Sequence, residues 1–549
     1  MSGTESVSEK FDYIVVGAGS AGSVTANRLS AVSSNRVILL EAGGTDKKFW
    51  IQTPLGYGKT FTDPSVNWMY HTAPIEMLEN RRSYWPRGKV LGGSSSINAM
   101  VYVRGQKEDY DDWADLGCKG WGWSDVKPYF EKLEDLQWVD GSSDSGTHAL
   151  AISNNRDRLH PLCSKFIDAG KALGVPFNND LYSEHQEGVG YYSFTIKDGQ
   201  RMSAAKAYLD PVRSRPNLVV EDHACVKRLL FDGPKVIGVE YVKNDKLHVV
   251  RCAGEVILCA GAIGSPQLLQ LSGIGPEKLL KQLEIPIVVE NNEVGANLQD
   301  HLSIGYTFEG DRSTINNLLA SWPRRIFQGV RYILSKTGPL SLSVNQAGGF
   351  IRTDMTLWRP NMQLYFQPAS YSYVEDWPRR PLMRPDSFSG FSISAQPLRP
   401  ISRGTVMIKS RNQDESPEIK PEYFSVESDL DEMLIGAKTI RKLVSLSPLA
   451  EVIKREVIPG PSIRTDEQLV SDIRRRADTV YHPVGTCRMG HSVSQTVVDL
   501  ELTVRGTKNL RVVDASVFPK LVSGNTNGPT IMLAEKASEL ILKRASSCS

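Results

Sequence analysis

Three glycines near the start of the chain have the spacing of a turn that binds a dinucleotide. Gly17, Gly19 and Gly22 follow a short apolar run, Tyr13–Val16, which favours a buried strand of a parallel sheet. The first glycine permits a tight turn, the second lets the backbone approach a pyrophosphate, and the third lets a helix pack closely on the strand. The helix is expected to begin near Ser20, so its free N–H groups face the phosphates.

An acidic residue completes this fingerprint at the end of the next predicted strand, Arg36–Leu40. Glu41 lies nineteen residues beyond Gly22, where a carboxylate is expected to accept hydrogen bonds from the 2′ and 3′ hydroxyls of a ribose. A carboxylate there also disfavours a 2′-phosphate. The pattern therefore predicts dinucleotide binding rather than a plain structural turn, and it leaves NAD and FAD open.

Two further stretches of small residues could border the same ligand. Gly92 and Gly93 precede three serines, whose backbone and hydroxyl donors suit a phosphate or a polar ring edge, although a flexible surface loop has the same composition. The predicted strand Glu255–Cys259 runs into Ala260 and Gly261, so a second strand end of small residues can lie beside the first turn.

The composition excludes several classes of protein. Lys and Arg total 64 against 62 Asp and Glu, and the net charge of +2 gives no support to nucleic-acid binding. The seven cysteines are scattered without CxxC spacing, which favours free thiols and indicates no metal cluster. The polar first ten residues are unlike a secretory signal, and no run of eighteen apolar residues exists, so we expect a cytoplasmic location.

One segment could contact a membrane. Leu318–Leu334 places apolar residues on one side of a predicted helix, with Arg324, Arg325 and Arg331 nearby. A basic amphipathic helix can dock on a membrane surface, but packing on its own domain is the expectation we favour. Peripheral membrane contact is therefore kept as an alternative.

The chain resembles the glucose-methanol-choline (GMC) oxidoreductases, flavoproteins that oxidise alcohols. The resemblance rests on four motifs in fixed order: residues 88–111, GKVLGGSSSINAMVYVRGQKEDYD; residues 261–275, GAIGSPQLLQLSGIG; and the C-terminal segments HPVGTCRMG and NTNGPT. It is strongest to the choline dehydrogenase-like and aliphatic alcohol dehydrogenase branch. The resemblance implies FAD rather than NAD.

The resemblance also implies the fold and its domains. We expect a mixed α/β protein in which a Rossmann-like FAD-binding domain carries an inserted substrate domain built on an antiparallel sheet. The segments 1–155, 216–312 and 471–549 would form the FAD-binding domain. The segments 156–215 and 313–470 would form the substrate domain. The length of 549 residues fits two domains better than a single core.

Carried over residue by residue, the resemblance assigns the cofactor contacts. The glycine turn would hold the pyrophosphate, Glu41 the adenosine ribose, Val226 the adenine, and Asp514 with Ala515 the ribityl chain. The full set is Gly17, Gly19, Ser20, Ala21, Glu41, Ala42, Val90, Gly92, Asn98, Met100, Val101, Val226, Ala260, Gly261, Ser265, Tyr481, Asp514, Ala515, Gly528 and Pro529. Ile97 takes the place of a histidine that links the flavin covalently in some members, so FAD is expected to be non-covalent.

By the same resemblance His482 and Asn527 form the catalytic pair. A neutral imidazole can take the hydroxyl proton of an alcohol, and an amide can donate a hydrogen bond to the developing alkoxide. The other histidines, His301 and His491 among them, are expected to be structural or surface residues. Bound FAD would accept the hydride.

The expected reaction is the FAD-dependent oxidation of a primary alcohol to an aldehyde, with quinone or oxygen as the electron acceptor. The alternatives are a redox-silent lyase of the hydroxynitrile type, an oxidase of aromatic or sugar alcohols, and a nicotinamide dehydrogenase. Gln346 stands where related dehydrogenases often have an acid, which argues weakly against a quaternary ammonium substrate. Leu364–Phe366 would suit an apolar alcohol. The sequence leaves the oligomeric state open.

Overall fold

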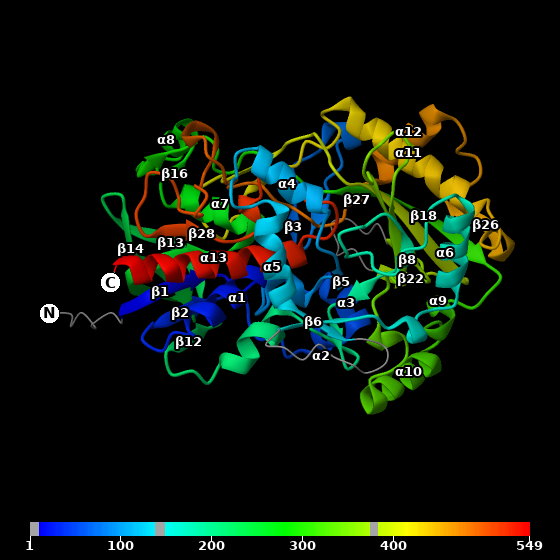
Figure 1. The fold of residues 1–549 in the computed structure, drawn as a ribbon, viewed down its shortest axis with the longest axis horizontal. Coiled ribbons are helices and arrows are strands. Elements are labelled where there is room, and N and C mark those ends of the chain that lie inside the picture. Colours follow the sequence, from blue (N-terminus) through cyan, green and yellow to red (C-terminus); the bar gives the residue numbers. More distant parts are fainter. Residues whose placement is uncertain (1–9, 138–148, 374–382, 549) are drawn as a thin grey trace.

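A computed structural model describes residues 10–137, 149–373 and 383–548 of the chain (Figure 1). Its first large sheet has a parallel core extended by an antiparallel meander. The strand order is β12 (Leu218–Glu221), β2 (Val37–Leu40), β1 (Lys10–Val16), β15 (Lys246–Leu258), β14 (Lys235–Lys243) and β13 (Cys225–Asp232), with β28 (Leu510–Val512) also paired to β15.

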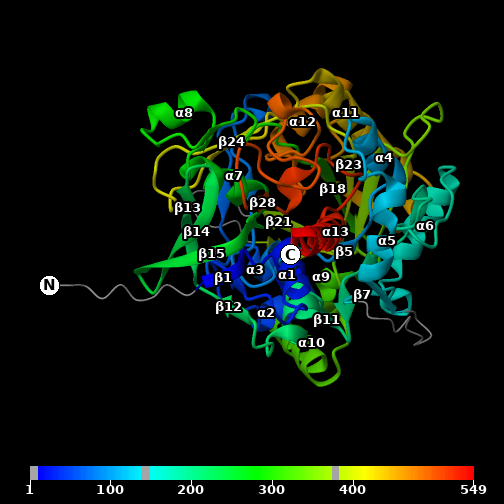
Figure 2. The same cartoon turned by 60° about the vertical axis from the view of Figure 1, so that its left-hand side comes forward.

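The parallel core explains the uninterrupted apolar run that begins the chain. In β1, Tyr13 lies opposite Val37 of β2, and Ile14 lies opposite Val256 of β15, so the strand is central and its side chains are buried. Two helices from opposite ends of the chain, α1 (Ser20–Leu29) and α13 (Asn527–Cys548), pack side by side against this sheet (Figures 1 and 2). Arg28 of α1 pairs with Glu535 of α13 at 2.6 Å.

The second large sheet is antiparallel. Its order is β26 (Ile453–Ile458), β18 (Leu302–Gly310), β23 (Gly390–Pro397), β20 (Met362–Gln367), β19 (Ala347–Ile351) and β8 (Gly188–Tyr191), with β27 (Asp478–Thr479) paired to β18. The helix α11 (Glu427–Val444) crosses β23 closely, because Gly436 offers no side chain. A Cβ there would lie 3.1 Å from Ala395 and from Met362.

The remaining elements connect and flank the two sheets. The helices are α2 (Phe49–Gln52), α3 (Tyr57–Thr60), α4 (Lys107–Asp115), α5 (Trp123–Leu133), α6 (Leu162–Ala172), α7 (Gly261–Leu271), α8 (Glu277–Gln282), α9 (Ile315–Leu318), α10 (Trp322–Ser335) and α12 (Asp466–Arg476). The short strands are β3 (Tyr70–His71), β4 (Tyr84–Trp85), β5 (Val101–Tyr102), β6 (Glu134–Gln137), β7 (Leu150–Ser153), β9 (Ser193–Phe194), β10 (Ile196–Lys197), β11 (Gln200–Arg201), β16 (Ile274–Gly275), β17 (Val289–Glu290), β21 (Tyr371–Tyr373), β22 (Met383–Pro385), β24 (Thr405–Met407) and β25 (Glu418–Lys420).

The expected fold class is confirmed, since a Rossmann-like sheet and a separate antiparallel sheet are both present. The expected domain boundary at residue 312 does not coincide with the division between the two sheets. Strand β18 lies before it, yet β18 is a strand of the antiparallel sheet. The chain enters that sheet at Leu302, from the polar turn at residues 293–302.

In the part of the chain that the structure describes, no group of three or more His, Cys, Asp and Glu side chains could hold a metal ion. The six cysteines with described side chains are free thiols. Within the same residues, no helix combines the length and apolarity needed to cross a bilayer.

Candidate active site

One cavity of about 810 Å³ joins the two sheets. It begins where β1 and β2 end, at Gly17 and Glu41, and reaches the antiparallel sheet at Tyr365 of β20. Most of the residues expected to contact the cofactor or substrate line it: Gly17, Gly19, Ser20, Ala21, Glu41, Ala42, Asn98, Met100, Val101, Val226, Ala260, Gly261, Tyr481, His482, Asp514, Ala515 and Asn527. Five do not: Val90, Gly92, Ser265, Gly528 and Pro529.

The glycine turn has the geometry that its spacing predicts. Gly17 has a φ of +95°, and a Cβ on Gly22 would lie 1.8 Å from the Gly17 carbonyl oxygen, so neither position accepts a larger residue. Gly19 differs, because a Cβ there would meet nothing closer than Gly93 at 3.9 Å. The backbone at Gly19 therefore faces open cavity, where a pyrophosphate could approach.

The loop at residues 92–98 packs directly on this turn. Gly92 donates its backbone N–H to the Ala18 carbonyl at 2.7 Å, and a Cβ on Gly93 would lie 2.7 Å from the Gly19 Cα. Gly92 therefore packs on the glycine turn, and Val90 is buried in a small apolar cluster with Ile97. Their expected contact with the cofactor stays a prediction.

The carboxylate of Glu41 is held at the end of β2 by the turn itself. Its two oxygens accept the backbone N–H groups of Ala18 and Gly43, each at 2.8 Å. Burial raises the pKa of Glu41 to about 7, against the lowering effect of these two hydrogen bonds. Glu41 also lines the cavity, so further hydroxyl donors could reach it.

Asp514 joins two strand ends at the middle of the cavity. One carboxylate oxygen accepts the Gly261 N–H at 2.9 Å and the Ser265 hydroxyl at 2.5 Å, and the other accepts the Ser516 N–H at 2.8 Å. Burial raises the pKa of Asp514. Ser265 does not line the cavity and supports Asp514 from behind, so its expected contact with the cofactor stays a prediction.

Gly528 and Pro529 do not line the cavity, and Gly528 packs closely on its neighbours. Both lie in the first turn of α13, and a Cβ on Gly528 would come within 2.8 Å of the Tyr102 ring and 2.9 Å of the Val103 carbonyl. The missing side chain lets α13 approach β5, and the helix start is thereby brought to the cavity.

His482 is the buried imidazole at the far end of the cavity. Its Nδ1 lies 3.1 Å from Nδ1 of His301, whose Nε2 lies 2.9 Å from the Leu398 carbonyl oxygen. A carbonyl only accepts hydrogen bonds, so Nε2 of His301 carries the proton and its Nδ1 is an acceptor. Nδ1 of His482 must then carry a proton, which leaves an unprotonated Nε2.

Burial and neighbouring charge keep this pair neutral. Burial lowers the pKa of His301 to about 4. The pKa of His482 lies well below its ordinary value, first because of burial and then because of His301 and Arg87. The sequence analysis did not predict this pair, because it expected His301 to be a structural or surface residue.

The backbone around His482 is fixed by a second buried carboxylate, Asp300. It accepts the His482 N–H at 2.7 Å and the Thr479 hydroxyl at 2.5 Å, and Tyr423 donates to it as well. Burial raises the pKa of Asp300 to about 6. Asp300 and His301 are adjacent in the polar turn 293–302, so one turn sets both the position and the tautomer of the imidazole.

The expected partner of His482 needs correction. Asn527 does not reach the imidazole: its Oδ1 accepts the Ser20 hydroxyl at 2.7 Å, at the glycine turn. Asn525 lies beside His482 instead, with its Nδ2 3.2 Å from Nε2. The motif NTNGPT contains both asparagines, and only the entry of the chain into α13 at Asn527 decides which one faces the imidazole.

Arg201 supports the cavity from behind. The residue is 1% exposed, and its guanidinium donates to Asn98 Oδ1 at 2.8 Å and to the Ser95 carbonyl at 3.1 Å. Burial lowers the pKa of Arg201 to about 9. This side chain fixes the orientation of Asn98. The sequence analysis missed Arg201, because its acceptors are carbonyl oxygens of residues far away in the sequence and no motif contains it.

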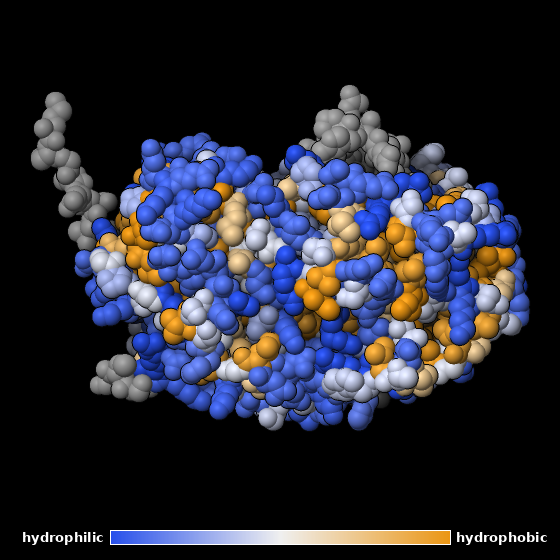
Figure 3. Space-filling model, turned by 90° about the horizontal axis from the view of Figure 1, so that it is seen from above, coloured by the Kyte–Doolittle hydropathy of each residue, from blue (hydrophilic) through white to orange (hydrophobic). Residues whose placement is uncertain are grey.

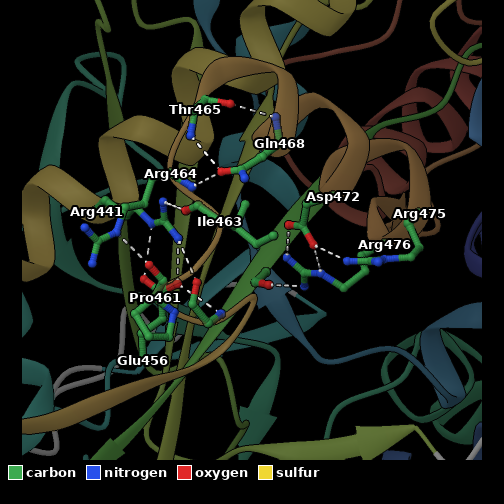
Figure 4. A network of polar contacts seen from close by, with 12 residues as sticks. Arg441, Glu456, Pro461, Ile463, Arg464, Thr465, Gln468, Asp472, Arg475 and Arg476 are labelled. Atoms are coloured by element: carbon green, nitrogen blue, oxygen red, sulfur yellow. Dashed lines mark hydrogen bonds and ion pairs between the residues drawn. The ribbon is translucent and has the colours of Figure 1, made fainter.

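The outer wall of the cavity is held by the polar network of Figure 4. Arg476, at the end of α12, donates to Asp472 at 2.7 Å and to the Gly305 carbonyl of β18 at 2.8 Å. Arg441 of α11 pairs with Glu456 of β26 at 2.7 Å. These contacts tie two helices to the strands that border the cavity.

Arginines outnumber carboxylates among the residues that line the cavity. In the described chain its carboxylates are Glu41 and Asp514, at the nucleotide end, and Asp478, whereas four arginines line it: Arg81, Arg87, Arg475 and Arg476. Gln346 is not among the lining residues, since it is buried and accepts the His160 N–H at 2.7 Å. The substrate argument based on Gln346 therefore loses its structural basis.

The residues present fit FAD. The open backbone at Gly19 suits a pyrophosphate, and Gly261 likewise has nothing within 4 Å of a would-be Cβ. Glu41 is an acceptor placed for ribose hydroxyls, and the cavity continues past Asp514 to His482. Ile97 lines the cavity and offers no nucleophile for a covalent link.

Comparisons with known proteins give a consistent result. The family profiles described as GMC oxidoreductase match residues 11–303 and 400–534. An alcohol dehydrogenase [acceptor] of Pseudomonas putida is 44% identical over 97% of this chain and 96% of its own length. Human mitochondrial choline dehydrogenase is 41% identical over 98% and 91%. The structure of an FAD-dependent oxidoreductase from Chaetomium thermophilum superposes with a TM-score of 0.87, at 25% identity, over 98% of this chain and all of that one.

Proposed function

This chain belongs to the GMC oxidoreductase family of FAD-dependent enzymes, as its motifs predicted, and we propose that it oxidises neutral primary alcohols to aldehydes. The observation that carries the proposal is that His482 lines the cavity with its Nε2 beside the Asn525 amide, while its Nδ1 is held by His301, from which we infer an unprotonated Nε2. A buried base next to a hydrogen-bond donor is what removal of a hydroxyl proton requires.

Each polar group at this end of the cavity has a role. Nε2 of His482 accepts the hydroxyl proton, while Nδ1–H continues to donate to His301. Asn525 donates to Nε2 in the resting protein. The alcohol hydroxyl would replace Asn525 on the single lone pair of Nε2, and the freed amide would donate to the substrate oxygen, which becomes the alkoxide as its proton passes to Nε2.

Non-covalent FAD would be held by the glycine turn, Glu41, Asp514 and the loop at residues 92–98. When bound, it supplies the acceptor for the hydride that leaves the alcohol carbon. We expect acid precipitation of the holoprotein to leave all flavin in the supernatant. Flavin that stayed with the polypeptide would overturn the non-covalent part of the proposal.

The substrate class follows from charge. The arginines that line the cavity outnumber its carboxylates, and the carboxylates Glu41 and Asp514 are occupied by backbone donors. The third carboxylate, Asp478, accepts the Ser83 hydroxyl and lies 3.9 Å from the Arg81 guanidinium. A quaternary ammonium ion would have to compete with these partners for a counter-ion, so a neutral alcohol is favoured over choline. The P. putida relative is named an alcohol dehydrogenase [acceptor] and the human relative a choline dehydrogenase, and the charge of the cavity favours the first substrate class.

A quinone is the proposed electron acceptor. The P. putida and human relatives are named dehydrogenases, and Escherichia coli relatives of 38% identity are named oxygen-dependent choline dehydrogenases, so the two acceptors have to be compared directly. The test is an anaerobic screen of flavin reduction with choline and with aliphatic, aromatic and sugar alcohols, followed by reoxidation with oxygen or a water-soluble quinone. Fast reduction by neutral alcohols and fast reoxidation by quinone are expected. Faster reduction by choline would reject the substrate class, and faster reoxidation by oxygen would reject the acceptor.

A further inference from the structure

The helix α10 presents its apolar side outward. At about 100° per residue, its apolar residues fall within an arc of about 140°. Trp322, Phe327 and Leu334 are 71%, 64% and 80% exposed, and the same face carries Ile326, Val330 and Ile333, which are also exposed. The buried residues of the helix are Gln328 and Tyr332. This is the reverse of an ordinary surface helix, whose apolar stripe faces the core.

The helix stands at the edge of the molecule. Figures 1 and 2 both show α10 at the lower margin, away from the two large sheets. The opposite face, seen in Figure 3, is largely hydrophilic, with its apolar residues in separate small groups. Two more exposed aromatic residues, Phe49 and Trp50 of α2, adjoin α10, because the Phe49 ring lies 6.1 Å from that of Tyr332. We call Phe49, Trp50 and the six exposed residues of α10 the apolar edge.

The charge around the apolar edge is positive. Between Asp311 and Asp354 the sequence contains no Asp or Glu. Arg324, Arg325 and Arg331 flank the apolar arc, and they donate to backbone carbonyls and a hydroxyl of their own segment. Lys47 and Lys48 precede Phe49. Large apolar and aromatic residues bordered by arginines are the pattern of a helix that lies in the interface of an anionic bilayer.

We propose that the apolar edge docks on the surface of an anionic membrane. The helix has 14 residues, too few to span a bilayer, so it would lie in the interface plane. The positive border of the apolar edge complements a negatively charged surface such as that of anionic lipids. The proposal reverses the expectation that this helix packs its apolar side on its own domain.

The docked orientation would place the cavity near the membrane. Segment 49–61 connects the apolar edge to the cavity, which its residues Tyr57 and Phe61 line. Beyond α10 the chain runs inward to Asn345, which also lines the cavity. An apolar quinone dissolved in the bilayer would thus meet the protein on this side. The docking itself does not rest on the proposed reaction.

Vesicle binding tests the proposal. The holoprotein is sedimented with vesicles of phosphatidylcholine alone or mixed with phosphatidylglycerol, and activity with a water-soluble quinone is measured in parallel. We expect binding to the mixed vesicles, weakened by added salt. The variant Trp322→Ser/Phe327→Ser/Leu334→Ser should lower the partition coefficient by about two orders of magnitude while soluble activity is retained.

A matched control removes exposed apolar residues elsewhere. Leu247, Met355 and Val493 are 62%, 74% and 72% exposed, and the variant Leu247→Ser/Met355→Ser/Val493→Ser should bind vesicles like the wild type. Equal loss in both variants, or absence of vesicle binding by the wild type, would overturn the proposal. A concentration-dependent dimer that the α10 variant abolishes, without vesicle binding, would also overturn it and assign the edge to a second copy of the chain.

Discussion

Asn525 and Asn527 lie two residues apart, yet they serve opposite ends of the cavity. Asn525 is 3.2 Å from Nε2 of His482, whereas Asn527 accepts the Ser20 hydroxyl at the glycine turn. The helix α13 begins at Asn527, so Asn525 lies in the preceding turn. The side chains of the two asparagines therefore point in different directions. A motif of six letters could not show this, because the direction depends on where the helix begins.

Replacing the two asparagines separately should therefore give different defects. We predict that Asn525→Ala slows flavin reduction by alcohol about 100-fold, the usual effect of losing one donor to a developing oxyanion, with FAD content unchanged. Asn527→Ala should weaken FAD retention and leave the reduction rate of the bound fraction near that of the wild type. Rapid anaerobic mixing and flavin quantification decide the matter. The reverse pattern would restore Asn527 to the catalytic position.

His301 acts at the same scale, through its hydrogen bond to His482. Because the pKa of His482 is lowered, Nε2 stays unprotonated as the pH falls through 6.5, and flavin reduction should slow only at lower pH. His301→Leu removes the acceptor for Nδ1–H of His482 and should slow flavin reduction about 10- to 100-fold. The pH at which the reduction rate falls on the acid side should also shift.

The conservative change at this position provides the control. His301→Gln can accept from Nδ1–H of His482 and donate to the Leu398 carbonyl, so it should recover most of the rate and the original pH profile. A leucine variant with an unaltered pH profile would show that His301 only fills space.

Among the elements, the strand, turn and helix at the N-terminus were predictable because their constraints are local. Gly17 and Gly22 interact across one turn, and the apolar run of β1 reflects burial on both faces of a sheet. The tautomer of His482 depends on Leu398 and His301, which belong to other parts of the chain. The sequence also could not predict that the apolar face of α10 points outward, because periodicity identifies an apolar face but not what covers it.

The glycine turn offers a test with an internal control. A Cβ on Gly22 would lie 1.8 Å from the Gly17 carbonyl oxygen, so Gly22→Ala must displace α1 from β1. We predict loss of FAD binding and a fall in the free energy of unfolding of about 3 kcal/mol or more.

Gly329 of α10 is the matched position, because it is helical and a Cβ there would meet nothing within 4 Å. Gly329→Ala should leave FAD binding unchanged and raise stability by up to about 1 kcal/mol, as expected for alanine in a helix interior. Thermal unfolding and FAD titration measure both variants. A stable, FAD-replete Gly22→Ala protein would contradict the packing described for the turn.

At the scale of the whole molecule, the cavity is assembled from segments that are distant in the sequence. The glycine turn and the Asp514 strand end belong to the parallel sheet, the polar turn at 293–302 joins the two sheets, and the antiparallel sheet supplies the far wall. The nucleotide end is built for binding and the His482 end for proton transfer. This division explains why the N-terminal fingerprint identified the ligand class but not the reaction.

The most direct test of the account is the single-turnover reduction of bound flavin by a neutral primary alcohol, compared between the wild type and His482→Ala without oxygen. We predict that the wild-type flavin is reduced and that the variant reacts more slowly by about two to four orders of magnitude with the same FAD content. No reduction of the wild type by any alcohol, or equal rates in the two proteins, would contradict the assignment of His482 as the base.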